Sequence, residues 1–260
     1  MVDWLEHNRD AWNRESRSGE SPWCQPVDEL TIAAAHAGQW AVRLTPTVDV
    51  PAAWFSGVRG KRVLCLASGG GQQAPVLAAA GALVTSFDVS EEQLAKDQLV
   101  ADRDGLDIRL VRGDMTDLSS FEPGDFDLIF HPNANLFVND VRTVWVECYR
   151  VLKPTGRLLA GLMNPDFFLF DHDALDAGEP LVVRNRLPFS EANDSSEGAL
   201  KQRLDKHEQL VFSHSLDDLI GGQIDAGFVI AGLYEDRWTV AATRLSEFMS
   251  PCIATLGIKH

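Results

Sequence analysis

From Lys61 onward, short apolar runs alternate with segments of helical pattern, and this alternation limits the possible folds more than any other feature of the sequence. Predicted strands cover residues 62–67, 82–87, 107–111, 126–130 and 156–163. Helices are expected over residues 72–80 and over residues 140–152. Another helix is expected to begin at Ser90, which forms a capping box with Gln93. Strands and helices in this order build parallel βαβ units, so we predict an α/β protein with a doubly wound sheet.

The two flanks of this pattern differ from it. Residues 1–60 (the leader) are expected to be helical over 3–15 and 28–37 and to cover the pocket, although their five tryptophans also suit simple packing. Residues 165–211 (the insertion) are rich in Asp, Glu, Asn and Ser, with one expected strand at 181–187. We interpret them as an insertion over the open rim or as a surface excursion. A helix from Ser215 to Gly227 and two closing strands, 228–234 and 252–259, complete a domain over residues 61–260.

Charge and cysteine content exclude several classes of function. Acidic residues outnumber basic ones by 38 to 23, giving a net charge of -15, which opposes binding to nucleic acid or to an anionic membrane. The four cysteines lie far apart and form no CxxC pair, so we expect reduced thiols and no metal site.

The charged N-terminus lacks an apolar signal core, and no apolar run approaches the ~20 residues of a membrane helix. We therefore expect a cytoplasmic protein, and the sequence leaves the oligomeric state open.

A glycine-rich loop, Ser68 to Gly71, connects the first predicted strand to its helix. Backbone N–H groups at such a turn can face a bound ligand, because glycine allows close approach. Asp88 ends the second strand, where its carboxylate can accept hydrogen bonds from two ribose hydroxyls. Ligands of doubly wound sheets bind at this carboxyl edge. The same loop also satisfies a dinucleotide fingerprint, Gly69-x-Gly71-x-x-Ala74, so two cofactor classes remain open.

Later residues separate these two classes. The third strand leads into Gly113-Asp114-Met115, an acidic and an apolar side chain suited to an adenine, and residues 150–159 read RVLKPTGRLL. With these motifs in order, residues 61–164 resemble class I S-adenosylmethionine-dependent methyltransferases. The resemblance implies a seven-stranded, mostly parallel Rossmann-like sheet with one reversed strand, and S-adenosylmethionine as the cofactor.

The resemblance also implies roles for individual residues. The loop would lie against the methionine part of the cofactor, Asp88 at the ribose, and Asp114 with Met115 at the adenine. The full expected cofactor set is Ser68, Gly69, Gly70, Gly71, Asp88, Val89, Gln93, Asp114, Met115, His131 and Asn133. This chain departs from the family loop at two places, since Cys65 stands at its acidic position and Ala67 at its first glycine.

The expected reaction is methyl transfer to a small-molecule acceptor. His131, at the end of the fourth strand, is the candidate general base, and its alternative is a local structural role. One alternative function is an NAD(P)-dependent oxidoreductase, which the spacing Tyr149-x-x-x-Lys153 favours. Pro154 argues against it, because it places this pair at a helix end. A non-catalytic module that binds S-adenosylmethionine is the other alternative.

Overall fold

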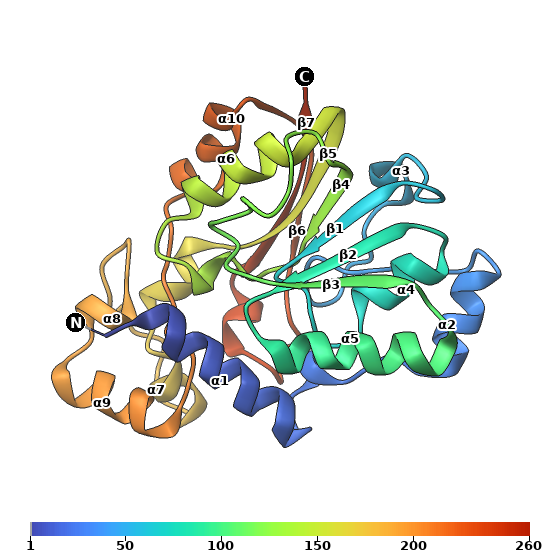
Figure 1. Ribbon diagram of the computed structural model, residues 1–260. Coiled ribbons are helices and arrows are strands. Elements are labelled where there is room, and N and C mark those ends of the chain that lie inside the picture. Colours follow the sequence, from blue (N-terminus) through green and yellow to red (C-terminus); the bar gives the residue numbers. More distant parts are fainter. Residues whose placement is uncertain (1) are drawn as a thin grey trace.

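A computed structural model describes residues 2–260, and its centre is a seven-stranded sheet in the order β3-β2-β1-β4-β5-β7-β6 (Figure 1). The strands are β1 (Arg62–Leu66), β2 (Leu83–Asp88), β3 (Ile108–Arg112), β4 (Phe126–His131), β5 (Leu152–Met163), β6 (Phe228–Asp236) and β7 (Cys252–Lys259). The pairs among β1 to β5 are parallel, and β7 runs antiparallel to both β5 and β6. The predicted α/β sheet with one reversed strand is confirmed.

Helices cover both faces of the sheet, as the doubly wound pattern requires. The helices that follow the strands are α4 (Gln73–Ala79), α5 (Glu91–Asp104), α6 (Val141–Val151) and α10 (Gly222–Ala226), which a π-helical turn over Asp217–Gly221 precedes. Before the sheet come α1 (Trp4–Ser18), α2 (Glu29–His36) and α3 (Ala52–Phe55). The insertion contains α7 (His172–Asp176), α8 (Glu191–Asp194) and α9 (Glu197–Lys206).

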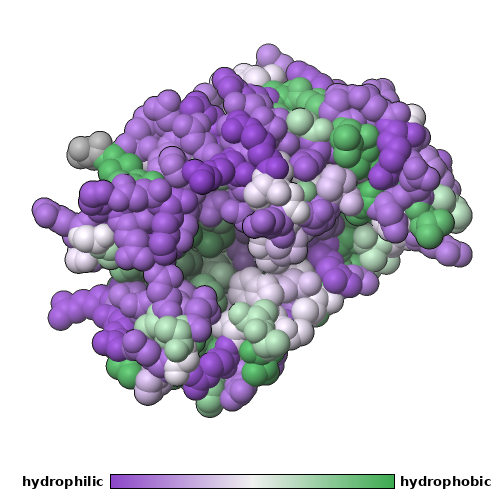
Figure 2. All heavy atoms as spheres, turned by 90° about the horizontal axis from the view of Figure 1, so that it is seen from below, coloured by the Kyte–Doolittle hydropathy of each residue, from purple (hydrophilic) through white to green (hydrophobic). Residues whose placement is uncertain are grey.

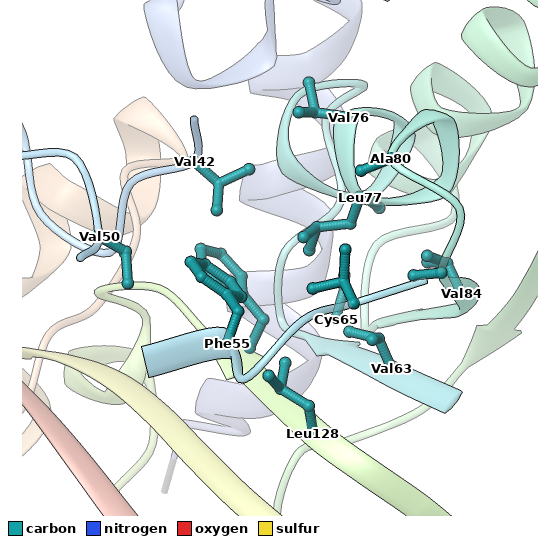
Figure 3. Close-up of a cluster of buried hydrophobic side chains, with 14 of the residues drawn as sticks. Val42, Val50, Phe55, Val63, Cys65, Val76, Leu77, Ala80, Val84 and Leu128 are labelled. Atoms are coloured by element: carbon teal, nitrogen blue, oxygen red, sulfur yellow. The ribbon is translucent and has the colours of Figure 1, made fainter. Parts of the chain in front are cut away.

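Alternating side chains of the central strands build two separate cores. Val63 and Cys65 of β1 pack with residues of α2, α3 and α4 (Figure 3), and Leu64 and Leu66 pack with residues of α6 on the other face. This period of two is what a strand buried on both faces imposes. The Cys65 side chain therefore belongs to the core, where burial raises the pKa of its thiol well above the ordinary value.

Two expectations about strands were wrong, one about the existence of a strand and one about where a strand begins. Residues 181–187 do not form a strand, since Val183 makes only an isolated bridge to Phe170 and is itself exposed. This apolar stretch has no neighbouring strand with which to form a ladder. β5 begins at Leu152, directly after α6, and thus earlier than the expected residue 156. Pro154 ends the helix but is compatible with the extended backbone that follows it.

The turn after β1 is held to α5 by a buried carboxylate. Asp97 accepts hydrogen bonds from the Gly71 backbone N–H (2.7 Å) and from the Ser86 hydroxyl (2.6 Å). Burial raises the pKa of the Asp97 carboxyl to about 7, which outweighs the opposing effect of these two donors. Below about pH 7 the Asp97 carboxyl is protonated in the native state, whereas in the unfolded chain it is protonated only below about pH 4.

Replacing Asp97 by asparagine is expected to stabilise the protein at pH 8. Asparagine can accept from Gly71 and donate to Ser86 without an ionised group in the core. The advantage of Asp97→Asn over wild type should grow by about 1–4 kcal/mol between pH 4 and pH 8, because wild type loses stability as pH rises through about 7. Urea unfolding at several pH values measures this difference, and an advantage that does not change with pH would contradict it.

Candidate functional site

A cavity of about 450 Å³ lies at the carboxyl ends of β1, β2, β4 and β5, the edge where ligands of doubly wound sheets bind. The molecular face seen in Figure 2 is hollowed, and apolar residues gather inside the hollow. Of the expected cofactor set, the residues on the cavity wall are Ser68, Gly69, Asp88, Val89, Gln93, Asp114, Met115 and Asn133.

Gly70 and Gly71 were expected on this wall, and within the described residues they do not line it. Both have positive φ, 122° and 76°, and both pack against the leader. A Cβ on Gly70 would lie 2.7 Å from the Trp23 carbonyl oxygen, and one on Gly71 would lie 2.9 Å from Pro26. Their glycine identity serves the turn and its close packing.

Asp88 occupies the centre of the site at the end of β2. Its carboxylate accepts hydrogen bonds from the backbone N–H groups of Gly69 (3.0 Å) and Ser90 (2.9 Å), one on each oxygen. Burial raises the pKa of the Asp88 carboxyl to about 6, although the backbone donors act in the opposite direction. Each oxygen retains a further lone pair, so the group can still accept hydrogen bonds from a ligand.

The capping box expected at the start of α5 is only half formed. The Ser90 hydroxyl accepts from the Gln93 backbone N–H (3.1 Å), but Ser90 donates its own N–H to Asp88. Gln93 is one of the residues that line the cavity, and its buried Oε1 has no hydrogen-bond partner among the described residues.

Asp114 lies on the wall after β3, where it forms a local turn. Its carboxylate accepts from the Thr116 backbone N–H (3.0 Å) and from the Thr116 hydroxyl (2.6 Å). Met115, next in the chain, is partly buried against the core that contains α6. An acidic and an apolar group thus adjoin at this end of the cavity.

His131 was expected both to contact the cofactor and to act as a base, and its position does not support either role. Its ring lies beneath the rim, packs edge-on against Trp145 at 6.0 Å between ring centroids, and is not on the cavity wall described for residues 2–260. Nδ1 lies 3.0 Å from the Leu66 carbonyl oxygen. Burial lowers the pKa of the His131 ring to about 4, so the ring is a poor base at neutral pH. Phe130 and His131 point to opposite faces of β4, and His131 faces α6.

Asn133, two residues further on, does reach the cavity. Its Nδ2 lies 3.7 Å from the sulfurs of Met163 and Cys252, and its Oδ1 has no partner among residues 2–260. Asn135 is buried elsewhere, donating to the Gly161 carbonyl (2.6 Å), and His214 approaches the Asn135 carbonyl (3.0 Å). Of the two asparagines, the structure therefore brings Asn133 to the site.

Sequence reasoning named no side chain on the far side of the cavity. That wall comes from α1, from residues 43–46, from residues 136–138 and from Trp238. The aromatic content of the leader is the one signal for it, since Trp12 and Trp23 line the cavity, whereas Trp4, Trp40 and Trp54 pack on aromatic neighbours. No pattern around Trp238 marks it, because its place depends on tertiary packing alone.

The insertion touches α1 and contributes none of the cavity-lining residues found within residues 2–260. Asn8 donates to the Leu210 carbonyl (2.9 Å) and accepts from the Leu210 N–H (2.7 Å), and Trp4 packs on Phe212, which directly follows the insertion. At the other end of α1, Asn13 accepts from the Ser90 hydroxyl (2.7 Å). The end of the insertion and the start of α5 thus hold α1 over the cavity.

Polar atoms without partners gather on the cavity wall. Within residues 2–260, four lining side chains have a buried oxygen that makes no hydrogen bond, namely Thr45, Ser68, Gln93 and Asn133. Each of these oxygens is itself buried, so the four mark polar positions within the wall and do not by themselves identify a ligand.

Three comparisons with known proteins agree with this geometry. A family described as a methyltransferase domain matches residues 64–160. The chain is 48% identical to an uncharacterized methyltransferase of Bacillus subtilis, YbaJ. The alignment spans 255 residues and covers 98% of each protein. The chain belongs to the class I S-adenosylmethionine-dependent methyltransferases.

More distant relatives of this methyltransferase share part of its length. A ubiquinone biosynthesis O-methyltransferase of Pseudomonas savastanoi is 31% identical over 116 residues, 44% of this chain and 50% of that protein. The crystal structure of an S-adenosylmethionine-dependent methyltransferase from Mesorhizobium loti aligns with a TM-score of 0.59 at 20% identity. That alignment covers 80% of this chain and 94% of the other.

The oxidoreductase alternative fails on the structure as well as on the comparisons. Lys153 lies in β5 and pairs with Asp127 (3.0 Å), and the Tyr149 hydroxyl donates to the His260 carbonyl (3.2 Å). Neither residue is on the cavity wall described for residues 2–260.

Within the same residues, no helix is long and apolar enough to cross a membrane.

Proposed function

We propose that the methyltransferase holds S-adenosylmethionine across the carboxyl ends of β1, β2 and β3. Asp88 would accept hydrogen bonds from the ribose hydroxyls, and Asp114 with Met115 would contact the adenine. Ser68, Gly69, Val89 and Gln93 complete the near wall. The observation that carries this assignment is the Asp88 carboxylate, which ends β2 on the cavity wall and keeps lone pairs beyond those used by its two backbone donors.

The cofactor supplies a methyl group on a sulfonium, which is an excellent leaving group, so the protein has mainly to align the acceptor and exclude water. The apolar far wall and α1 suit these two tasks. We propose a small-molecule acceptor, because the cavity is partly enclosed and the chain carries a net charge of -15, which disfavours nucleic acid. In this proposal the leader covers the pocket and the insertion holds it in place.

Binding of S-adenosylhomocysteine is expected to weaken as pH falls through about 6. The ribose hydroxyls bind the ionised Asp88 carboxylate better than its protonated form, and burial puts its pKa at about 6 in the free protein. Affinity should be constant above pH 7 and fall up to about tenfold per pH unit below 6. Isothermal titration calorimetry between pH 5 and pH 8 measures this dependence.

Asp97 titrates near Asp88, so its contribution has to be separated. The Asp97→Asn variant should keep the fall in affinity, because Asp97 lies behind the loop and Asp88 remains ionisable. An affinity that is flat from pH 5 to pH 8 in wild type would contradict the assignment of Asp88 to the ribose. We also propose that the protein is cytoplasmic, as its sequence predicts.

A further inference from the structure

A second hollow adjoins the cavity between the start of α1 and the end of β3. Its volume is about 370 Å³, and its lining residues come from α1 with its N-cap and from the segments at the ends of β2 and β3. We call it the α1–β3 groove. Four residues line both the groove and the cavity, namely Leu5, Val89, Gly113 and Asp114. The groove and the cavity therefore meet at these four residues.

The outer part of the groove is charged. Its remaining lining residues are Asp3, Glu6, Arg9 and Arg112, and none of them lines the cavity described for residues 2–260. Asp3, Glu6 and Arg112 are exposed. Charged side chains of this kind lie in water, so the groove leads from the edge of the cavity to the solvent.

The two carboxylates of the cavity differ in their relation to the groove. Asp114 lines both hollows, whereas Asp88 lines the cavity alone and is only 8% exposed. In the function proposed above, Asp114 contacts the adenine of the cofactor and Asp88 binds the ribose. The adenine would then adjoin the groove, and the ribose would be enclosed by the protein.

The chemistry of adenine determines which of its atoms faces Asp114. An ionised carboxylate only accepts hydrogen bonds, and in a nucleoside the exocyclic amino group on C6 carries the N–H donors of the adenine while the ring nitrogens accept. Asp114 would therefore bind this amino group, whose nitrogen is N6. Each Asp114 oxygen accepts one hydrogen bond from Thr116 and keeps a further lone pair for this contact.

We propose, building on the function proposed above, that the α1–β3 groove accommodates substituents on N6 of the cofactor. The amino group has two hydrogens, so one can bind Asp114 while a carbon chain replaces the other. Such a chain would pass Leu5 and Val89 and reach the solvent. The protein would then bind cofactor analogues that are enlarged at N6, and it would select its cofactor by the ribose and not by the size of the adenine.

The walls of the groove suit a chain with an apolar stem and a polar end. Leu5 and Val89 are half-buried where the groove meets the cavity, and they offer apolar contact to a stem. The charged side chains further out favour a polar group at the end of the chain. A 6-hydroxyhexyl group has both properties, and it is neutral, so it leaves the charge of the ligand unchanged.

The test compares two isomers of substituted S-adenosylhomocysteine, one with a 6-hydroxyhexyl group on N6 and one with the same group on the 2′ oxygen of the ribose. In calorimetric titrations the N6 compound should bind within about tenfold of unsubstituted S-adenosylhomocysteine. The ribose compound should bind at least about 30-fold more weakly, because it loses a donor to Asp88 and adds bulk at an enclosed position. A loss of more than tenfold for the N6 compound would overturn the inference.

Replacing Arg9 by tryptophan tests the path of the chain. Arg9 lines the groove and not the cavity, and its side chain is 30% exposed, so an indole in its place would fill part of the groove. Arg9→Trp should weaken binding of the N6 compound at least about tenfold and change the affinity for S-adenosylhomocysteine less than about twofold.

Asp10→Trp is the matched control for this variant. Asp10 is the next residue of α1, its side chain is 58% exposed, and it lines neither hollow. Binding of S-adenosylhomocysteine to both variants also shows that they are folded. Equal affinities of Arg9→Trp and Asp10→Trp for the N6 compound would contradict a path through the groove.

Failure of this inference can be told from failure of the proposed function. If S-adenosylhomocysteine binds and the ribose compound binds weakly, but the N6 compound loses more than tenfold, the groove assignment alone is wrong. If S-adenosylhomocysteine itself does not bind, the proposed cofactor site is wrong.

Discussion

Replacing Asp88 by asparagine is expected to weaken binding of S-adenosylhomocysteine by about 30- to 1000-fold. Hydrogen bonds to a charged group contribute roughly 1.5–3 kcal/mol each, and tenfold in affinity corresponds to about 1.4 kcal/mol. Both carboxylate oxygens already accept from backbone N–H groups, those of Gly69 and Ser90. An amide has one acceptor oxygen, so its NH₂ must face one of these donors and the ribose loses at least one partner.

Calorimetric titration of the purified variant with S-adenosylhomocysteine measures this loss. Asp107→Asn is the matched control, because Asp107 is exposed next to the other end of β3 and makes the same chemical change away from the cavity. Urea unfolding of Asp88→Asn establishes that the variant is folded. Wild-type affinity in a folded Asp88→Asn protein would show that Asp88 does not hold the ribose.

Replacing Gly161 by alanine should destabilise the protein by about 1–3 kcal/mol and disturb the cavity wall at Leu44 and Asn133. A Cβ at this position of β5 would lie 2.2 Å from the Leu44 carbonyl oxygen and 2.9 Å from the Asn133 nitrogen. Those two atoms are themselves joined by a hydrogen bond of 3.2 Å. Because both are backbone atoms, neither can yield by a rotamer change, and two segments of the cavity wall have to move.

Urea unfolding measures the stability of Gly161→Ala, and calorimetry measures its affinity for S-adenosylhomocysteine. Gly198→Ala is the matched control: Gly198 lies in α9, nothing lies within 4 Å of its added Cβ, and alanine favours the helix by up to about 1 kcal/mol. If both variants change stability equally, the close approach at Gly161 has no energetic weight.

The sheet could be predicted because its signal is local. Each strand from β1 to β4 is a short segment rich in apolar residues and bounded by helices or turns, and the reversed β7 follows from the family resemblance. Asp88 and Asp114 were predicted on the cavity wall for a related reason, since a residue that ends a parallel strand, or follows it closely, emerges at the carboxyl edge.

His131 shows why position along a strand is not enough. It also ends a strand, but the direction of its side chain decides between the cavity and the core, and both faces of β4 are covered by helices. When both faces are apolar, the sequence has no polar alternation from which to assign the direction. The prediction that Gly70 and Gly71 line the cavity was wrong for another reason. A glycine required by a turn and a glycine required by a ligand have the same sequence pattern.

The far wall of the cavity could not be predicted from any segment by itself. Trp12 is held there because Asn8 of the same helix pairs with Leu210, 202 residues away in the chain. Thr45 and Trp238 lie in irregular segments without periodicity. Long-range contacts place all three residues, and a single sequence does not encode such contacts in its local pattern.

Titration of the wild-type protein with S-adenosylmethionine and, separately, with NAD⁺ tests the central claim most directly. The near wall, which includes Ser68, Asp88 and Gln93, predicts saturable binding of S-adenosylmethionine at one site per chain and none of NAD⁺. Tight binding of NAD⁺ with no binding of S-adenosylmethionine would contradict the cofactor site described for this methyltransferase.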